Sequence, residues 1–261
     1  MKKLIGISLF TLVLAACGGG GGGDDSSAAP AAPTAPSTTA PGGLYLGYYQ
    51  EDPSTNPEDP TTGAFSLNLP TGDGSFSGSM FFTFVGCQSS NVGTVRGLKK
   101  STRVSGNWDG VIDGTAQGGA YQADWSDATQ SYKGTYANAN GKVHVDRLPC
   151  IAYDIAPNGT FEMFAAGTST PSSFALAVAG RQFNWPATSG AGEILLYVLD
   201  PAIAQTNANP FVTQTLLSGT ATSFVLAPSV SLVSGKEYIV AVSVGANGRR
   251  LAFGSRRFTA P

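Results

Sequence analysis

A glycine two residues before an aromatic residue recurs through the first half of this sequence. The five steps are Gly63-Ala-Phe65, Gly74-Ser-Phe76, Gly119-Ala-Tyr121, Gly134-Thr-Tyr136 and Gly159-Thr-Phe161. Residues two apart in a β-strand point to the same face of a sheet, so a large ring can cover the neighbouring bare backbone. Glycine also permits the bends of a curved sheet. The pattern therefore predicts a curved antiparallel meander or a small barrel over residues 44–167.

The rest of the chain is also predicted to be β-structure. From Leu44 onward there is no long helical periodicity, and short alternating runs are separated by glycine-containing turns. Asn140-Gly141, Asn158-Gly159 and Asn247-Gly248 are each flanked by strand-like residues, which is typical of β-hairpins. The predicted fold class is all-β.

The last ninety or so residues carry a second pattern. Leu232-x-x-Gly235-x-x-Tyr238 leads into the apolar run Ile239–Val242. This resembles the turn into strand F of the fibronectin type III family, which implies that Tyr238 is a buried corner residue whose hydroxyl bonds upstream backbone. The resemblance implies a β-sandwich over residues 168–261, and another seven-stranded sandwich is the alternative.

The resemblance also assigns the other strands of this sandwich. Phe183-Asn184-Trp185 would be a strand with a core tryptophan, and Asp200–Pro210 would be an insertion. The remaining strands would be Glu193–Leu199, Thr222–Leu226 and Arg249–Phe258.

The N-terminus has the layout of an export signal. A cationic Met1–Lys3 precedes the apolar stretch Leu4–Ala16, which is too short to span a bilayer as a helix. The stretch closes with Leu14-Ala15-Ala16-Cys17, which resembles the lipobox of bacterial lipoproteins. The resemblance implies that residues 1–16 are a removed signal peptide and that Cys17 carries acyl chains such as palmitate. An ordinary signal peptide with a chance cysteine is the alternative.

Residues 17–43 are predicted to be a disordered tether behind this anchor. Gly18–Gly23 is a run of six glycines, and Ser26–Pro41 contains only Ser, Ala, Pro and Thr, so nothing there can bury a core. In the Gram-negative lipoproteins that the lipobox resembles, an Asp after the acylated cysteine retains the protein on the inner membrane. Here that position is Gly18, so the outer membrane is expected, facing either the periplasm or the outside.

Two cysteines remain once Cys17 is acylated. Cys87 and Cys150 form an even pair in an exported chain, and the expected compartment is oxidising. A Cys87–Cys150 disulfide is predicted, and a pair of free buried thiols is the alternative.

Composition excludes several function classes. Only 12% of residues are charged and the net charge is −2, which argues against nucleic-acid binding. There is one histidine, His144, and no G-x-S-x-G nucleophile motif. No catalytic residue, resident metal or cofactor is therefore predicted.

Carboxylates gather in two places, which could bind Ca²⁺ or run glycoside hydrolysis. No EF-hand spacing is present, so solvated turns are the favoured interpretation. The two groups are Glu51, Asp52, Glu58 and Asp59, and then Asp109, Asp113, Asp124 and Asp127.

Five aromatic residues form the candidate binding surface. They could stack on sugar rings, although covering the barrel core or its glycines is the favoured alternative. They are Trp108, Trp125, Tyr121, Tyr132 and Tyr136.

A second group comprises four arginines on the final predicted strand. They either protect a sheet edge or dock against the acidic first half. These are Arg249, Arg250, Arg256 and Arg257.

Together these features predict a lipid-anchored envelope protein. It would contact the membrane through the acyl chains on Cys17 and present its β domains to a protein, glycan or envelope component. The alternatives are a structural or assembly lipoprotein that acts as a spacer and, last, a carboxylate-based glycan-processing enzyme.

Overall fold

The computed structural model describes residues 40–52, 54, 62–83, 91–112, 115–145, 153–206, 208–247 and 249–261. Residues 36–261 fall into one compact unit. The predicted acylation of Cys17, most of the tether and the predicted Cys87–Cys150 disulfide lie outside the described residues. These remain predictions.

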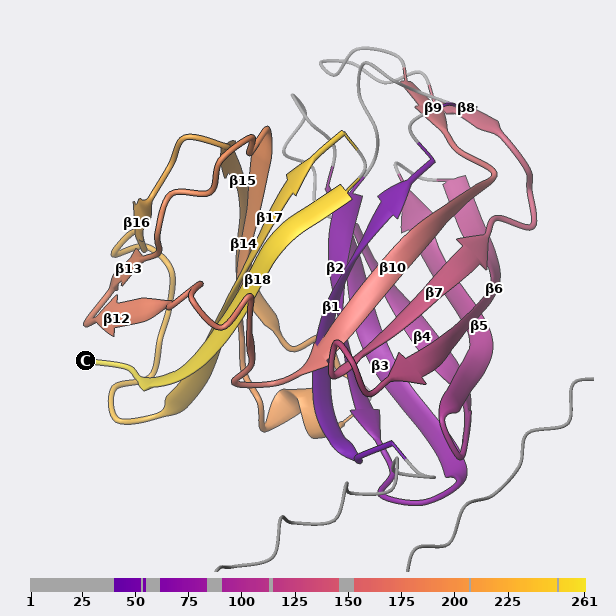
Figure 1. The fold of residues 1–261 in the computed structure, drawn as a ribbon, viewed down its shortest axis with the longest axis horizontal. Coiled ribbons are helices and arrows are strands. Elements are labelled where there is room, and N and C mark those ends of the chain that lie inside the picture. Colours follow the sequence, from indigo (N-terminus) through magenta and orange to yellow (C-terminus); the bar gives the residue numbers. More distant parts are fainter. Residues whose placement is uncertain are drawn as a thin grey trace, which may run out of the picture. The chain divides into compact units, whose positions relative to one another are not determined.

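The first half forms a closed, eight-stranded antiparallel barrel (Figure 1). Its strands follow one another around the barrel in the order β1-β10-β7-β6-β5-β4-β3-β2, so the predicted meander closes on itself and leaves no open edge. A short hairpin of β8 and β9 lies between β7 and β10 in the chain. The strands are β1 (Gly43–Glu51), β2 (Thr62–Leu69), β3 (Gly74–Thr83), β4 (Asn91–Lys100), β5 (Arg103–Ile112), β6 (Thr115–Ser126), β7 (Ser131–Ala137), β8 (Val143–Val145), β9 (Tyr153–Ile155) and β10 (Asn158–Ala165).

Aromatic rings inside the barrel face glycines on the neighbouring strand. A Cβ atom added to Gly47 would lie 2.2 Å from the ring of Phe65. A Cβ atom added to Gly134 would lie 2.7 Å from the ring of Phe161. An eight-stranded barrel has an interior just wide enough for side chains, so a ring fits only where its neighbour has none. In the described strands the pairs are Tyr49–Gly63, Phe65–Gly47, Phe76–Gly97, Trp108–Gly119, Tyr121–Gly106, Tyr136–Gly159 and Phe161–Gly134.

The second half is a sandwich of two antiparallel sheets. A five-stranded sheet has the order β11-β18-β17-β14-β15, and a three-stranded sheet has the order β12-β13-β16. Their inner faces share one apolar core that includes Phe183, Trp185, Leu196 and Val240. The strands are β11 (Ser169–Thr170), β12 (Ala177–Ala179), β13 (Gln182–Asn184), β14 (Glu193–Leu199), β15 (Phe211–Ser218), β16 (Ser223–Val225), β17 (Glu237–Ala246) and β18 (Arg249–Thr259).

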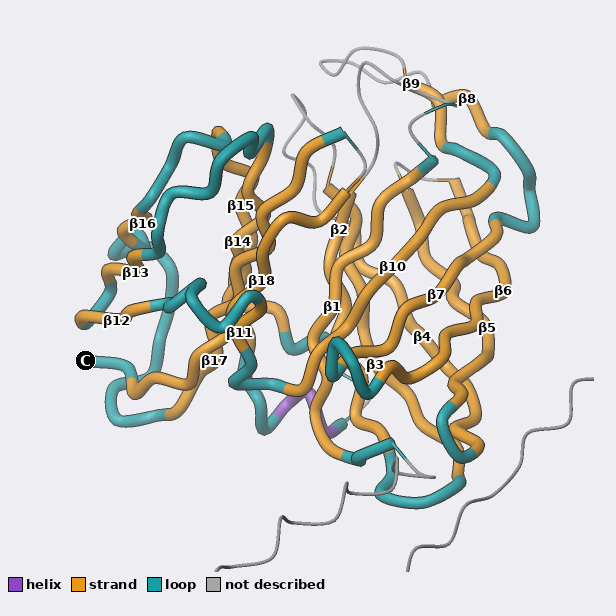
Figure 2. Tube along the Cα trace, viewed as in Figure 1, coloured by secondary structure: helices purple, strands orange, loops and turns teal. Residues whose placement is uncertain are grey.

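The predicted corner residue is present at Tyr238. Its side chain is 3% exposed, and its hydroxyl accepts a hydrogen bond from the backbone N–H of Val233 at 3.0 Å. Gly235 has a φ of +78°, which the preceding turn requires. The expected insertion contains a single 3₁₀ turn, η1 (Ile203–Gln205), drawn in purple in Figure 2. Membership of the fibronectin type III family itself remains a prediction.

The outer face of the barrel packs against the outer face of the five-stranded sheet. The ring of Phe164 in β10 stacks on Phe253 in β18 at 4.8 Å between centroids. The hydroxyl of Tyr197 donates to the carbonyl of Gly47 at 3.3 Å. Leu46 in β1 belongs to the apolar cluster between the barrel and the five-stranded sheet, whereas Tyr45 lines the barrel interior. β1 is therefore buried on both faces.

An ion pair sits within this contact. Arg250 of β18 donates from Nε to the carboxylate of Glu162 in β10 at 2.7 Å, and both side chains are largely buried. The same carboxylate accepts a bond from Ser131 at 2.8 Å, and the guanidinium of Arg250 lies 4.9 Å from the ring centroid of Phe164.

Only part of the predicted arginine docking is observed. Arg250 reaches the barrel, whereas Arg256 donates to the carbonyl of Leu176 and Arg257 pairs with Glu237 on the surface of the sandwich. Arg249 is exposed.

Replacing Gly134 by Ala should destabilise the barrel. The added methyl would lie 2.0 Å from the carbonyl oxygen of Gln122, so we expect a loss of about 2 kcal/mol in the free energy of unfolding, as for other overpacked cores. Gly72→Ala is the control, because nothing lies within 4 Å of its added methyl, and we expect a change within about 0.5 kcal/mol. Urea denaturation measures both; equal stability of the two variants would contradict the proposed crowding.

Replacing Arg250 by Ala should cost about 3 kcal/mol, because it leaves the buried Glu162 carboxylate without its closest cation. Arg257→Ala, which breaks an exposed pair, should cost less than about 1 kcal/mol. The two melting curves, recorded at the same salt concentration, test this difference. Similar losses of stability in both variants would mean that the contact between the barrel and the sandwich does not depend on the buried Glu162–Arg250 pair.

Candidate functional site

The two ends of the barrel differ in their connections. Short turns at residues 70–73, 101–102 and 127–130 join strands at one end, which we call the turn end. The connections from β1 to β2, β3 to β4, β5 to β6 and β7 to β10 leave from the other end, which we call the loop end. Cys87 belongs to the β3–β4 connection and Cys150 to the β8–β9 connection, both outside the described residues.

A buried lysine closes the turn end. Lys99 alternates with Gly97 and Val95 on the inner face of β4, and its side chain is fully buried. Its ammonium group donates to the carbonyls of Ala40 at 2.7 Å, Pro70 at 2.9 Å and Thr71 at 3.2 Å. Burial lowers the pKa of this ammonium, and the charge of Asp73 opposes that shift.

The segment just before β1 is thereby held at the turn end. Ala40 is itself fully buried in the barrel core. The hydroxyl of Tyr45 donates to the carbonyl of Pro41 at 2.9 Å. The chain therefore enters the barrel at the turn end.

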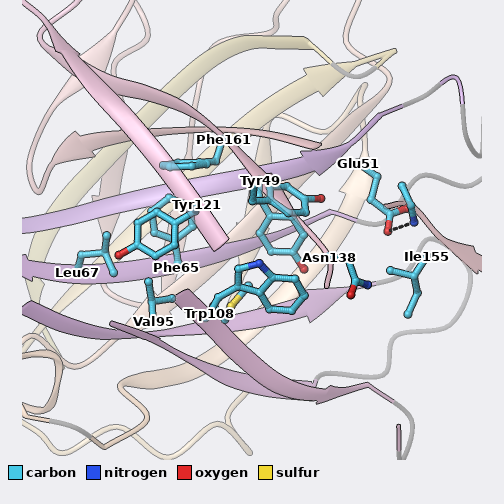
Figure 3. A pocket seen from close by; sticks show the side chains of 13 residues that line it. Tyr49, Glu51, Phe65, Leu67, Val95, Trp108, Tyr121, Asn138, Ile155 and Phe161 are labelled. Carbon is cyan, nitrogen blue, oxygen red and sulfur yellow. Dashed lines mark hydrogen bonds between the residues drawn. The ribbon is translucent and has the colours of Figure 1, made fainter. Parts of the chain in front are cut away.

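A small cavity lies inside the barrel toward the loop end (Figure 3). Its volume is about 50 Å³, which is room for very few water molecules and far below the several hundred Å³ of a typical ligand pocket. Figure 3 shows the rings of Phe65, Tyr121 and Phe161 in one group and Glu51 with Asn138 beyond them. The interior is thus filled rather than hollow.

Polar groups surround the loop-end side of this cavity. Glu51 is 3% exposed, and its carboxylate accepts a hydrogen bond from the N–H of Ala156 at 2.9 Å. Asn138 donates to the amide oxygen of Gln117 at 2.9 Å. The hydroxyl of Tyr136 and the amide nitrogen of Gln117 have no hydrogen-bond partner among the described residues.

Tyr136 can act only as a neutral hydroxyl. Burial raises the pKa of Tyr136 well above its usual value of 10.0, and the charge of Glu51 adds to the shift. In this neutral form it can donate a hydrogen bond to a small polar molecule.

A much larger groove, of about 710 Å³, lies on the outer face of β6, β7 and β10. Gln122, Thr135 and Thr160 stand directly opposite one another on the three strands and form an exposed polar row. Asp52 borders the groove, and the backbone N–H of Ser54 lowers the pKa of its carboxyl group. The remaining lining residues are Glu51, Ala120, Tyr121, Tyr136, Ala137, Asn158 and Gly159.

The chemistry of this groove is that of short hydroxyl, amide and carboxylate groups. These groups bind hydroxyls, backbone amides or cations through hydrogen bonds. The sequence alone does not reveal this groove, because Gln and Thr at alternating positions are also found on ordinary solvent-exposed strands. Glu51 and Asp52 were noticed only as members of an acidic cluster.

The five aromatic residues of the predicted binding surface lie in the barrel interior. Trp108, Tyr121 and Tyr132 are buried, while Trp125 and Tyr136 pack against the same core. Trp108 donates to the carbonyl of Ala137 at 3.1 Å. These rings fill the barrel and face its glycines, so in the described structure they do not present an exposed stacking surface.

The acidic residues of the second cluster belong to separate surface interactions. Asp109 pairs with Arg96, Asp124 pairs with Arg103 at 2.8 Å, and Asp127 accepts from the indole of Trp125. Glu58, Asp59 and Asp113 lie outside the described residues, and His144 is exposed. Within the described part of the chain, no three His, Cys, Asp or Glu side chains are grouped so that they could hold a metal ion.

Removing the hydroxyl of Tyr136 should not destabilise the protein. A buried hydroxyl without a partner costs about 1 kcal/mol or more, so Tyr136→Phe should hold or raise the unfolding free energy. Tyr238→Phe is the matched control and should lose about 1 kcal/mol, because it breaks the bond to Val233. Equal losses in thermal denaturation would show that Tyr136 has a partner in solution.

Comparisons with protein-family models, with curated proteins and with solved structures find no match to this chain. In the described residues, no helix is both long enough and apolar enough to cross a membrane.

Proposed function

We propose that this protein is a lipoprotein anchored in the outer membrane through acyl chains on Cys17, and that it binds a polar ligand of the cell envelope on its barrel surface. The ligand is a glycan or a polypeptide. The proposal joins the lipobox-like Leu14–Cys17 and the tether sequence to the surface chemistry of the barrel.

The observation that carries the binding role is the contrast between the two spaces of the barrel. The interior leaves about 50 Å³, whereas the outer groove offers about 710 Å³. A ligand pocket usually has about 300–1,000 Å³, so the outer groove is the candidate site and transport inside the barrel is not supported.

The path of the chain favours presentation of the loop end. Lys99 and Tyr45 hold Ala40 and Pro41, near the end of the predicted tether, at the turn end, so the tether is not disordered up to Gly43 as predicted. A chain anchored through Cys17 would then have the turn end nearer the membrane. Asp52, at the loop-end side of the groove, would face away from the membrane.

A spacer role is the second candidate. It is favoured by the continuous apolar contact and the buried Glu162–Arg250 pair between barrel and sandwich, which would keep the two at a fixed spacing. Loss of ligand capture through groove substitutions would distinguish binding from spacing.

Acylation is tested by replacing Cys17 with Ser. We expect the variant to incorporate no radiolabelled palmitate and to accumulate as precursor, because the acylated thiol is gone. The wild type should fractionate with outer-membrane markers, and Gly18→Asp should move part of it to the inner membrane. Equal palmitate labelling of wild type and Cys17→Ser would sink the anchoring proposal.

Binding is tested by filling the groove with charge and bulk. Thr135→Arg/Thr160→Arg places two long side chains on its central row, and we expect at least a tenfold loss of material captured from envelope extract, about 1.4 kcal/mol. Ser105→Arg/Asn107→Arg adds the same charge to exposed positions of β5 outside the groove and should capture normally. Unchanged capture by the groove variant would contradict this site and favour the spacer.

A further inference from the structure

Residues 40–42 lie at the turn end of the barrel, just before β1 begins at Gly43, and we call them the strap. Ala40 is fully buried in the barrel core. A Cβ atom added to Gly42 would lie 2.5 Å from the backbone of Thr71, in the turn between β2 and β3. The strap therefore packs directly on this turn and is part of the folded barrel, although it precedes the first strand.

Two side chains from the barrel interior hold the strap. The ammonium group of Lys99 donates to the carbonyl of Ala40 at 2.7 Å and also to the carbonyls of Pro70 and Thr71. The hydroxyl of Tyr45 donates to the carbonyl next to Ala40 in the chain, at 2.9 Å. Lys99 thus ties the strap to the turn between β2 and β3 from within the barrel.

The strand that follows the strap is held in a different way. β1 is paired with β2 from Gly43 to Gln50 and with β10 from Tyr45 to Glu51, so backbone ladders run along both of its sides. The strap lies outside these ladders. Segments with few backbone hydrogen bonds open at a lower free energy than the ladders beside them. The strap can therefore leave the barrel while β1 stays in place.

We propose that residues 40–42 are a strap, fastened by Lys99, that closes the turn end of the barrel and opens as a unit while the barrel stays folded. Opening brings Lys99 into contact with water. It also releases the three residues to the chain that precedes them, which adds about 10 Å of reach when they are extended. This device is separate from the ligand binding proposed above and does not depend on acylation of Cys17.

Lys99 is itself the reporter of opening. An N-hydroxysuccinimide ester acetylates accessible lysines, and mass spectrometry compares Lys99 with Lys100, the next residue, whose side chain is exposed. Burial lowers the pKa of the Lys99 ammonium, which by itself would speed acetylation, so slower labelling reports access. In residues 18–261, which retain the whole compact unit, we expect Lys99 to react at least about tenfold more slowly than Lys100.

Urea separates opening of the strap from unfolding of the barrel. The effect of urea on an equilibrium scales with the surface that becomes exposed, and release of three residues exposes little. We therefore expect the acetylation rate of Lys99 to stay nearly constant at urea concentrations below the unfolding transition, which circular dichroism records. A rate that rises with urea in parallel with global unfolding would overturn the proposal.

A methyl group placed under the strap supplies the variant. In Gly42→Ala the added methyl meets the backbone of Thr71, and we expect Lys99 to be acetylated at least about fivefold faster. Gly72→Ala is the matched control, because it lies in the same turn and nothing is within 4 Å of its added methyl. Lys99 should react there as in the wild type, and Lys100 should react equally in all three proteins.

Tyr45→Phe loosens the strap without adding bulk. It removes the hydrogen bond to the carbonyl of Pro41, and we expect about fivefold faster acetylation of Lys99. Unchanged labelling in both strap variants, equal acceleration in the Gly72→Ala control, or a wild-type Lys99 as reactive as Lys100 would each overturn the proposal. If circular dichroism shows that the strap variants do not fold, the urea series on the wild type decides alone.

Discussion

The crowding of the barrel interior is the constraint on which the rest of this structure depends. Seven ring–glycine pairs in the described strands let large aromatic side chains fill the narrow interior of a barrel of eight strands. Because the rings fill the interior, the proposed binding role is assigned to the outer surface of the barrel. The same crowding explains why a methyl group added at Gly134 has nowhere to go.

The barrel and the sandwich are stabilised by one another through β1 and β10. Each strand contributes one face to the barrel interior and the other to the contact with the five-stranded sheet, as Tyr45 and Leu46 illustrate. Within that apolar contact, the Glu162–Arg250 pair satisfies two charges that would be costly if left alone. The contact thus combines an apolar cluster with one largely buried ion pair.

Protected and unprotected features are distributed unevenly over the molecule. Lys99 seals the turn end by donating to three carbonyls, and the arginines of β18 guard one edge of the sandwich. The outer groove has no comparable cover among the described residues. The groove is therefore where a ligand is proposed to bind.

Local patterns in the sequence were sufficient for the all-β class, the curved first half and the corner at Tyr238, because strand alternation and turn residues act over a few positions. The spacing of Gly134 and Tyr136 predicted a shared face, and both do point into the barrel. The sequence could not decide which ring meets which glycine, since Phe161 reaches Gly134 only through the register of β10 and β7. Nor could it decide that Trp108 lies inside, that Arg250 alone among four arginines reaches Glu162, or that Lys99 is buried. Those outcomes depend on barrel closure and on contacts between distant strands, which only the tertiary structure brings together.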